Sequence, residues 1–353
     1  MKILVLVQDY PSLEKPYAMS YVHSRNIEYK KAGHEVKIIS FSTLKAYLHD
    51  SLEVSLFDKA LLEWSDIIVS HAPNVKNHVR ALRGVEHKKI VFFFHGHEVL
   101  NQYGDYPKPY AWKKVQLTKI LLIKCYDFFK IKILHQFLKH ISGKNKIGLI
   151  FVSEWMKRQF IKNIKLIPDQ LGLTKTIPNA CNSVFLESTY QFDSKNKLGD
   201  CITIRPLDDS KYAVDLVVEA ALNNPEKIFH IYGKGSYFDF NKKPENIFVI
   251  NQFIQQKDIP DLLNKYKIAF MPTRYDAQGV MVCEMATYGI PVVTTDFEVC
   301  VEMLSDFSNV SFVNEKDFKN IHCNEYDLAL NSKILHFDPD LLIAQELDVF
   351  DEL

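Results

Sequence analysis

The sequence predicts an α/β fold built from two doubly wound halves. Short apolar runs of the strand type alternate with helical patterns along the chain, and this alternation starts again near residue 200. Strands that are separated by helices form parallel sheets, so the alternation favours a parallel α/β architecture. The length of 353 residues suits two domains, each of which can bury its own core.

The N-terminal half begins with a strand at residues 2–7, where a β-branched and leucine-rich run shows no alternation. Such a run is typical of a strand that is buried on both faces of a sheet. A helical pattern follows and ends at Gly33, a residue type that often terminates helices. Further strands are expected at residues 35–40, 66–70, 89–94 and 147–153. We assign residues 1–186 to an N-terminal Rossmann-like domain.

The C-terminal half repeats the pattern after a polar stretch at 187–199, which we interpret as a linker. Its strands are expected at residues 201–205, 228–232, 247–250, 268–271, 291–295 and 310–313. We assign 200–330 to a second Rossmann-like domain and expect the segment 331–353 to pack back on the first. Ligands bind beyond the carboxyl ends of the strands in such sheets, so we expect the domains to face each other across a cleft.

Composition narrows the classes of function. Hydrophobic residues make up 47% of the chain and charged residues 24%, as in a soluble globular protein. The formal net charge of zero provides no global field for nucleic acid, so no nucleic-acid partner is expected. The six cysteines lack metal-site spacing, which favours a reducing cytoplasm. The first apolar run is too short for a signal peptide, and no run reaches the roughly 18–20 residues that span a bilayer.

The most informative segment joins the fourth and fifth strands of the C-terminal domain. Asp276, Gln278 and Gly279 lie in a loop that opens a predicted helix at Val280, and Glu284 lies within that helix. Backbone N–H groups at a helix N-terminus form a site for an anion such as phosphate. An acid inside the helix can bind a ribose diol, and an acid before the helix can bind a sugar hydroxyl. An ordinary βαβ unit with solvated acids is the alternative.

This segment resembles the C-terminal signature of the retaining GT-B glycosyltransferases of family 4, the glycosyl transferases group 1. The family has an acid, seven residues, a Glu and then Ala-x-x-Gly-x-Pro-Val-Val. Asp276 and Glu284 flank seven residues here, and Ala286, Gly289 and residues 291–293 follow in register. The resemblance implies that Glu284 binds the donor ribose and Asp276 the transferred sugar. The first acid of the family is usually Glu, so Asp276 is a departure that reaches less far by one methylene.

Two cations and a glycine upstream match further landmarks of the family. Arg205 and Lys211 stand where the family has an Arg and a Lys, and the resemblance implies that they bind the diphosphate. Fixed cations stabilise the charge that grows on a nucleoside diphosphate leaving group. Gly233 follows a strand where the family has a Gly-x-Gly turn, and we assign it to the donor as well. A surface Arg and Lys and a plain turn are the alternatives.

In the N-terminal half, His95 follows the strand at 89–94 and matches a histidine of the family. We expect His95 to steady the sugar and His97 and Glu98 to contact the acceptor. These polar residues are also suited to capping the next helix. A metal site formed by the three would need a distant fourth ligand, and we expect no metal. The first loop, at 15–20, lacks the Gly-Gly turn that is frequent in the family.

The segment 112–141 combines an apolar stripe at helical spacing with many lysines and a single acid, Asp127. The lysines include residues 114, 119, 124, 130, 132 and 139. This pattern is typical of a helix that lies on an anionic membrane. A long helix that packs on the core and exposes a lysine face is the equally weighted alternative.

The resemblance implies that the chain transfers a hexose from a nucleotide diphosphate sugar, with retention, to a hydroxyl of a glycan or lipid-linked acceptor. A UDP-sugar is favoured over a GDP-sugar, no metal or cofactor is required, and His95, Asp276, Arg205 and Lys211 form the catalytic group. The expected setting is bacterial surface polysaccharide or glycoconjugate synthesis, in the cytoplasm and at the inner face of the membrane. A sugar-nucleotide epimerase of the same architecture and a non-catalytic nucleotide-sugar-binding subunit remain open, the latter because of Asp276 and the missing Gly-Gly turn.

Overall fold

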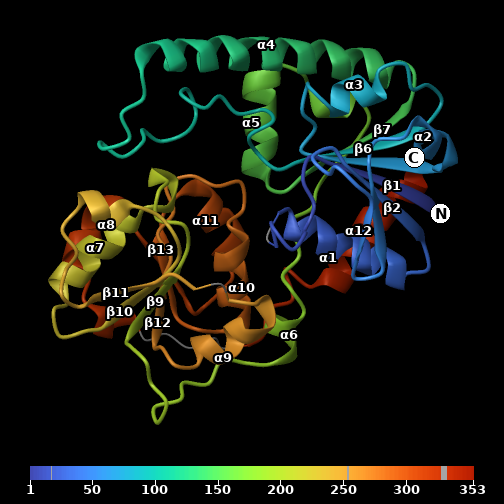
Figure 1. Cartoon of the computed structure of the whole chain (residues 1–353). Coiled ribbons are helices and arrows are strands. Elements are labelled where there is room, and N and C mark those ends of the chain that lie inside the picture. The colour runs from blue at the N-terminus through green and yellow to red at the C-terminus, as the bar shows by residue number, and fades with distance from the viewer. Residues whose placement is uncertain (17, 253, 327–331) are drawn as a thin grey trace. The chain divides into compact units, whose positions relative to one another are not determined.

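The computed structural model describes residues 1–16, 18–252, 254–326 and 332–353. They form an α/β protein with two compact units, each built around one sheet (Figure 1). Unit 1 contains Met1–Asp105, Leu117–Ala180 and Pro339–Leu353, and unit 2 contains Tyr106–Gln116 and Cys181–Asp338.

The division between the units differs in detail from the sequence-based one. The chain passes from unit 1 to unit 2 at Ala180 and Cys181, so the stretch 187–199 lies within unit 2. Residues 106–116 also group with unit 2, although they fall in the N-terminal half of the sequence. The hydroxyl of Ser210 donates to the carbonyl of Lys108 at 2.7 Å, which helps to fix this insertion. Residues 339–353, from the C-terminal segment, group with unit 1.

The sheet of unit 1 has eight strands among the described residues, in the order β3-β4-β2-β1-β5-β6-β7-β8. Their bounds are β1 Lys2–Val7, β2 Glu35–Ser40, β3 Tyr47–His49, β4 Leu52–Ser55, β5 Ile67–His71, β6 Lys89–Phe94, β7 Lys146–Phe151 and β8 Leu173–Thr176. All neighbours pair in parallel except β3 and β4, which form an antiparallel hairpin. The strand order reverses between β1 and β5, which makes the loops after these strands a natural place for a ligand.

The sheet of unit 2 is parallel throughout its described strands, in the order β11-β10-β9-β12-β13-β14. Their bounds are β9 Cys201–Ile204, β10 Phe229–Tyr232, β11 Ile247–Ile250, β12 Ile268–Phe270, β13 Val292–Thr295 and β14 Val310–Val313. This is the strand order of a dinucleotide-binding fold, and it reverses between β9 and β12. The loops that follow these two strands therefore diverge and leave room for a ligand.

Helices connect the strands in both units. Those of unit 1 are α1 Ser20–Lys31, α2 Lys59–Trp64, α3 His78–Leu82, α4 Leu117–Ser142, α5 Glu154–Ile164 and α12 Pro339–Glu352. Those of unit 2 are α6 Val184–Glu187, α7 Val214–Asn223, α8 Tyr237–Phe240, α9 Ile259–Leu263, α10 Val280–Tyr288 and α11 Glu298–Leu304. Short 3-10 turns are η1 Pro168–Gln170, η2 Ser210–Tyr212, η3 Gln256–Asp258, η4 Glu315–Asn320 and η5 Cys323–Tyr326.

A buried ion pair attaches the last helix to unit 1. Nε of Arg25 on α1 donates to Glu346 of α12 at 2.7 Å, and the Tyr29 hydroxyl donates to the same carboxylate. Arg25 also donates to Oδ1 of Asn179 at 2.8 Å. Burial raises the pKa of Glu346, although Arg25 and Tyr29 oppose this change. Each charge depends on its partner, because an unpaired charge in such a place is strongly destabilising.

Candidate functional site

An arginine fastens together the two loops that follow β9 and β12. The guanidinium of Arg274 donates to both carboxylate oxygens of Asp215, at 2.7 and 2.6 Å. The backbone N–H of Arg274 also donates to the carbonyl of Lys211 at 2.9 Å. Burial lowers the pKa of Arg274, but the pairing with Asp215 outweighs it and the net change is upward. Bidentate pairs of this kind fix geometry, so the two loops hold a defined arrangement.

Arg205, a predicted diphosphate ligand, is buried directly after β9, with 7% of its surface exposed. Its Nη1 donates to the carbonyl of Tyr212 at 2.6 Å and to the carbonyl of Pro272. Its Nε is buried and has no hydrogen-bond partner among the residues that the structure describes. Burial lowers the pKa of Arg205 to about 10, and the group stays cationic near neutral pH. A buried cation held by carbonyl groups retains its charge for an anionic ligand.

Lys211, the second predicted cation, lies in η2 on the same loop. Its Nζ is 4.7 Å from the ring centroid of Tyr212 and 6.0 Å from that of Tyr106. Burial lowers the pKa of Lys211, but Tyr212 and Asp276 act to raise it, and the net change of this pKa is upward. Asp276 also acts to raise the pKa of Arg205, so its charge is felt by both cations.

Gly233 follows β10 and lies against the Arg205 loop. A Cβ atom at Gly233 would lie 1.9 Å from the carbonyl oxygen of Arg205. No side chain fits there without displacing backbone, which explains the glycine by packing. The assignment of Gly233 to the donor stays a prediction, and the structure places Gly233 against the backbone of Arg205.

Helix α10 begins at Val280 behind Gly279, whose φ of 74° is left-handed. Among the residues that the structure describes, no side chain caps this end of the helix, and the first amides of a helix have no partner within it. Asp276 lies in the preceding loop, where its Oδ1 accepts from the backbone N–H of Ala277 at 2.7 Å. Gln278 in the same loop is buried. The predicted donor residues of this segment therefore gather around one helix N-terminus.

Glu284 lies inside α10 with 1% of its surface exposed. Its Oε1 accepts from the backbone N–H of Asn182 at 3.1 Å and from Nε2 of Gln256 at 3.0 Å. Burial raises the pKa of Glu284 to about 7, while these two hydrogen bonds lower it. The sequence analysis missed both partners, because each is distant in sequence from the motif that contains Glu284. Together they orient a carboxylate that is poised between its charged and neutral forms.

In unit 1, His95 follows β6 and contacts His71 at the end of β5. Nδ1 of His71 and Nε2 of His95 are 3.0 Å apart. Burial lowers the pKa of both imidazoles well below its usual range, and Arg25 adds to this effect. Nδ1 of His95 and Nε2 of His71 are buried without a hydrogen-bond partner in the described parts of the chain. The pair is therefore neutral, and His95 retains one ring nitrogen for another group.

Glu98 closes the turn that follows β6. Its buried carboxylate accepts from the backbone N–H groups of His95 and Gly96, the latter at 3.0 Å. These contacts engage Glu98 with its own loop, whereas the alternative expected from the sequence was a cap on the next helix. The imidazole of His97 points outward, with 75% of its side chain exposed. A metal site shared by these side chains is disfavoured, because Glu98 is committed to the backbone and Nε2 of His95 to His71.

The predicted helix at 112–141 is α4, and its two halves differ. The C-terminal half is packed: Leu134, Phe137, Leu138 and Ile141 are buried. Lys130 is buried as well and pairs with Asp127 at 2.8 Å, so it does not belong to an exposed lysine face. The N-terminal half exposes large apolar side chains, namely Leu117, Leu121, Leu122, Tyr126, Phe128 and Phe129. Among the described residues, no helix is both long and apolar enough to cross a membrane.

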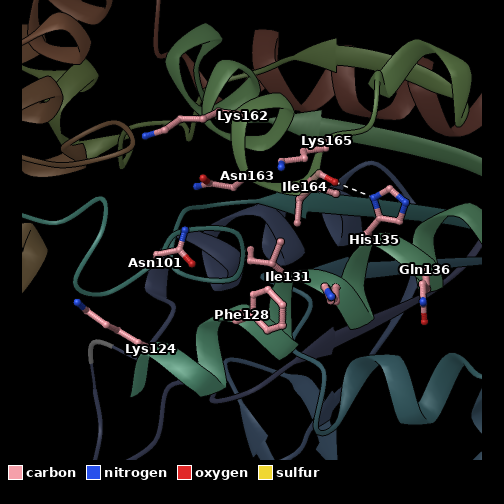
Figure 2. A pocket seen from close by; sticks show the side chains of 11 residues that line it. Asn101, Lys124, Phe128, Ile131, His135, Gln136, Lys162, Asn163, Ile164 and Lys165 are labelled. Carbon is pink, nitrogen blue, oxygen red and sulfur yellow. Dashed lines mark hydrogen bonds between the residues drawn. The ribbon is translucent and has the colours of Figure 1, made fainter. Parts of the chain in front are cut away.

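A pocket of about 590 Å³ lies between α4 and α5 (Figure 2). Phe128 and Ile131 supply an apolar wall. Four lysines and no carboxylate are among the lining residues; the lysines are Lys124, Lys132, Lys162 and Lys165. Figure 2 shows one edge of the pocket fixed by His135, which donates to the carbonyl of Ile164 at 2.8 Å. The pocket therefore combines an apolar wall with positive charge.

The fold is that of the GT-B glycosyltransferases, which confirms the predicted fold class. A sucrose-phosphate synthase from Thermosynechococcus elongatus is similar with a TM-score of 0.67 and 10% identity, and the similarity covers 100% of this chain and 99% of that one. WaaG, a glycosyltransferase involved in lipopolysaccharide biosynthesis, is similar with a TM-score of 0.56 and 13% identity, covering 98% and 95%.

Sequence comparison locates the family signal in unit 2. Residues 204–322 match the family of glycosyl transferases group 1. A protein of Klebsiella pneumoniae described as an uncharacterized 41.2 kDa protein in the cps region is 25% identical over 109 residues. That stretch is 31% of this chain and 29% of the relative, well under two thirds of its length. The family match lies within unit 2, and the structural similarity over nearly the whole chain shows the fold.

Proposed function

We propose that the protein is a retaining glycosyltransferase that moves a hexose from a nucleotide diphosphate sugar to a hydroxyl of a glycan or lipid-linked acceptor. The observation that carries the proposal is the buried cation Arg205, whose Nε has no hydrogen-bond partner in the described parts of the chain. Arg205 and Lys211 lie in the segment after β9, where the strand order reverses, and both approach the ring of Tyr212. Both residues fall within the region that matches the family. Asp276 is one negative charge near these two cations, and a diphosphate supplies further negative charge to them.

The two cations provide the electrostatic part of the mechanism. As the sugar leaves, negative charge grows on the diphosphate, and preorganised cations stabilise that charge. We therefore propose that transfer proceeds without a metal ion. The departing diphosphate oxygen accepts the proton of the attacking hydroxyl on the same face of the sugar, which retains the anomeric configuration. Arg274 and Asp215 serve as positioning residues that keep the two loops in register.

The two acids of the α10 segment bind the parts of the donor other than the diphosphate. Glu284, oriented by Asn182 and Gln256, binds the ribose diol, and UDP is the favoured nucleotide. Diphosphate oxygens accept from the N-terminal amides of α10 at Gly279 and Val280. Asp276 precedes the helix and binds the transferred sugar, with Gln278 and Gly233 supporting the loops around it.

His95 contributes to the sugar side of the reaction as a neutral imidazole. If His71 donates to Nε2 of His95, then Nδ1 of His95 carries the remaining proton and donates it to a sugar hydroxyl. The depressed pKa of both rings supports a hydrogen-bonding role over an ionic one. The exposed imidazole of His97 is assigned to the acceptor, while Glu98 shapes the turn that presents both histidines.

We also propose that the protein works in surface polysaccharide synthesis, in the cytoplasm, on the inner face of the membrane. The relative from a cps region supports the pathway. The exposed apolar half of α4 and the lysine-lined pocket beside it support attachment to an anionic membrane. An anionic phospholipid headgroup fits the pocket by charge, since Lys124, Lys132 and Lys165 line it, while the fourth lysine, Lys162, pairs with Asp105 at 2.7 Å.

The test is a screen of nucleotide sugars with the full chain. Release of nucleoside diphosphate in the presence of acceptor, together with an α-linked product from an α-linked donor, supports a retaining transferase. Activity that survives treatment with EDTA supports the metal-free mechanism. A donor whose sugar is changed without transfer indicates an epimerase, and binding without turnover indicates a non-catalytic subunit; either result overturns the proposal.

A further inference from the structure

Three side chains of unit 1 bring metal-ligating atoms together outside the residues assigned to the donor and acceptor. His23 lies on α1, His49 ends β3, and Asp50 begins the turn between β3 and β4. One ligand atom from each lies within 4.8 Å of the others, the single such group among the residues that the structure describes. The group combines two imidazoles and one carboxylate, a donor set that suits Zn²⁺.

The distances suit a small tetrahedral ion. Nε2 of His23 is 3.0 Å from Oδ2 of Asp50, and Nε2 of His49 is 4.0 Å from the same oxygen. Zinc bonds of about 2.0–2.2 Å place neighbouring ligand atoms of a tetrahedral shell about 3.4 Å apart. The observed distances lie on either side of this value, so small side-chain rotations are sufficient to bind an ion.

A second layer of hydrogen bonds orients His23. Its Nδ1 is 2.9 Å from the hydroxyl of Tyr10, which is buried and lies 3.1 Å from Nδ2 of Asn26. Oδ1 of Asn26 is itself buried without a partner in the described structure. A flip of this amide lets Tyr10 donate to Oδ1 and accept the Nδ1 proton of His23. Nε2 of His23 then offers its lone pair to the ion, as metal-ligating histidines do.

The turn between β3 and β4 fixes the position of Asp50 relative to α1. Asp50 and Ser51 both have left-handed φ values, 45° and 63°, in the turn between β3 and β4. Nζ of Lys30 on α1 donates to the carbonyl and hydroxyl oxygens of Ser51, at 2.8 and 3.1 Å. The hairpin is therefore tied to the helix that carries His23, and the three ligands need no large movement to close.

An ordinary ion pair between His23 and Asp50 explains only part of this arrangement. That pair requires one imidazole, yet the ring of His49 packs against the ring of His23 with centroids 4.6 Å apart. Nε2 of His49 then lies nearest to the same carboxylate oxygen that His23 contacts. Two imidazoles that converge on one oxygen repel each other when protonated, whereas a shared cation satisfies both as neutral ligands.

We infer that His23, His49 and Asp50 bind one Zn²⁺ ion, with a water molecule in the fourth position, and that this ion attaches the β3–β4 hairpin to α1. The site is independent of the proposed transferase chemistry, which uses Arg205 and Lys211 in place of a metal. Coordination replaces the hydrogen bond between His23 and Asp50, and the proton of His23 moves from Nε2 to Nδ1. The bound ion stabilises the folded state in proportion to its affinity.

The test uses the full chain, prepared without a histidine tag and freed of metal by EDTA and dialysis. Titration with Zn²⁺ in a calorimeter is expected to give one equivalent, and Co²⁺ is expected to give the visible absorption of a tetrahedral site. Asp50→Asn and His49→Gln should each weaken Zn²⁺ binding at least tenfold. Asn tolerates the left-handed backbone and Asp50 is exposed, so Asp50→Asn keeps the fold. Tyr10→Phe, which removes no ligand, should weaken binding about tenfold.

His87→Asn is the matched control. His87 is exposed and also has a positive φ, of 59°, so the same type of change is made away from the cluster. The control should bind Zn²⁺ as the wild type does, and Zn²⁺ should raise the melting temperature of both but not that of Asp50→Asn. Unchanged Zn²⁺ affinity in Asp50→Asn and His49→Gln refutes the site. So does a wild type that shows no saturable binding or no tetrahedral Co²⁺ spectrum.

Discussion

Two buried arginines, one in each unit, show how differently this protein uses the same side chain. Arg25 in unit 1 pairs with the carboxylate of Glu346 and with Asn179, so its charge is balanced within the protein. Arg205 in unit 2 donates to carbonyl groups, and its Nε has no hydrogen-bond partner among the described residues. Both are almost fully buried. Burial alone therefore does not identify a functional arginine. What distinguishes the two is whether a carboxylate of the protein pairs directly with the guanidinium.

The largest expected effect is on stability, at Arg25. Arg25→Ala leaves Glu346 buried without its counter-charge and should lower the free energy of unfolding by about 3–5 kcal/mol. Urea denaturation measures this loss. The double variant Arg25→Met with Glu346→Leu buries no charge and should recover part of the stability. Wild-type stability in Arg25→Ala would remove the contrast between the two arginines.

The next effect is on turnover, at Arg205. Arg205→Ala should raise the activation barrier by about 3–4 kcal/mol, a loss of roughly 10²–10³-fold in kcat, because the leaving diphosphate loses a preorganised cation. The free energy of unfolding should fall by less than the barrier rises. Arg83→Ala, at an exposed position, serves as the control and should leave both unchanged. A normal kcat in Arg205→Ala shows that the guanidinium of Arg205 does not stabilise the leaving diphosphate.

A buried acid of unit 2, Glu284, extends the comparison of buried charges to the pH dependence of stability. The folded pKa of Glu284 is about 7, above the ordinary value of 4.5, so the folded state holds this proton more tightly than the unfolded state does. Stability should therefore fall as pH rises from about 4.5 to 7, by about 3 kcal/mol from this group. Glu284→Gln abolishes the decrease, and denaturation of the ligand-free protein at pH 5 and pH 8 measures it. An identical pH dependence in wild type and variant contradicts this role.

Ligand binding separates the two acids of the α10 segment. Glu284→Gln should weaken binding of the nucleoside diphosphate by about 1.5–3 kcal/mol, the usual range for hydrogen bonds to a charged group. Asp276→Ala should largely preserve this affinity and depress transfer, because the proposal assigns Asp276 to the transferred sugar. Calorimetry with the nucleoside diphosphate and assays with the full donor distinguish the two. The reverse pattern shows that the roles are exchanged.

The smallest expected effect concerns the lysines of α4. They again allow a comparison between a cation that is paired within the protein and cations that line a pocket. Lys130 is buried and paired with Asp127, whereas Lys124 and Lys132 line the pocket, which has no carboxylate. Each pocket lysine changed to Glu should weaken binding to anionic vesicles about fivefold or more. The control reverses Lys139 and Lys146, which are exposed outside the pocket. If the control loses as much vesicle affinity per charge as the pocket variants do, the effect is one of general charge and there is no headgroup pocket.

The sequence predicts what depends on local pattern. Unalternated apolar runs located β1, β2, β5, β6 and β7 of unit 1 and the described strands of unit 2, but they did not locate β3, β4 and β8. The spacing from Asp276 to Glu284 located a helix entrance that the structure contains. These features follow from neighbours along the chain. The donor roles of Arg205, Lys211 and Glu284 remain predictions, although all three lie on unit 2 around loops that Arg274 fastens together.

What the sequence could not provide is long-range pairing. Asn182 and Gln256 hold Glu284, and His71 holds His95, across separations that no local period encodes. The sequence pattern extended the predicted helix back to residue 112, whereas α4 begins at Leu117, and nothing along the chain indicated that 106–116 joins unit 2. Glu98 shows the same limit, because a strand-end carboxylate that caps its own turn has the same sequence pattern as one that meets a ligand.

The return of α12 to unit 1 determines the order in which the chain can fold during synthesis. Leu342, Ile343 and Val349 of α12 complete a core that begins with Ile3 and Val5 of the first strand. Unit 2 is made between these parts, so a ribosome has released all of unit 2 before it releases the residues that finish unit 1. The nascent N-terminal half must therefore keep part of its apolar face uncovered until unit 2 has been made.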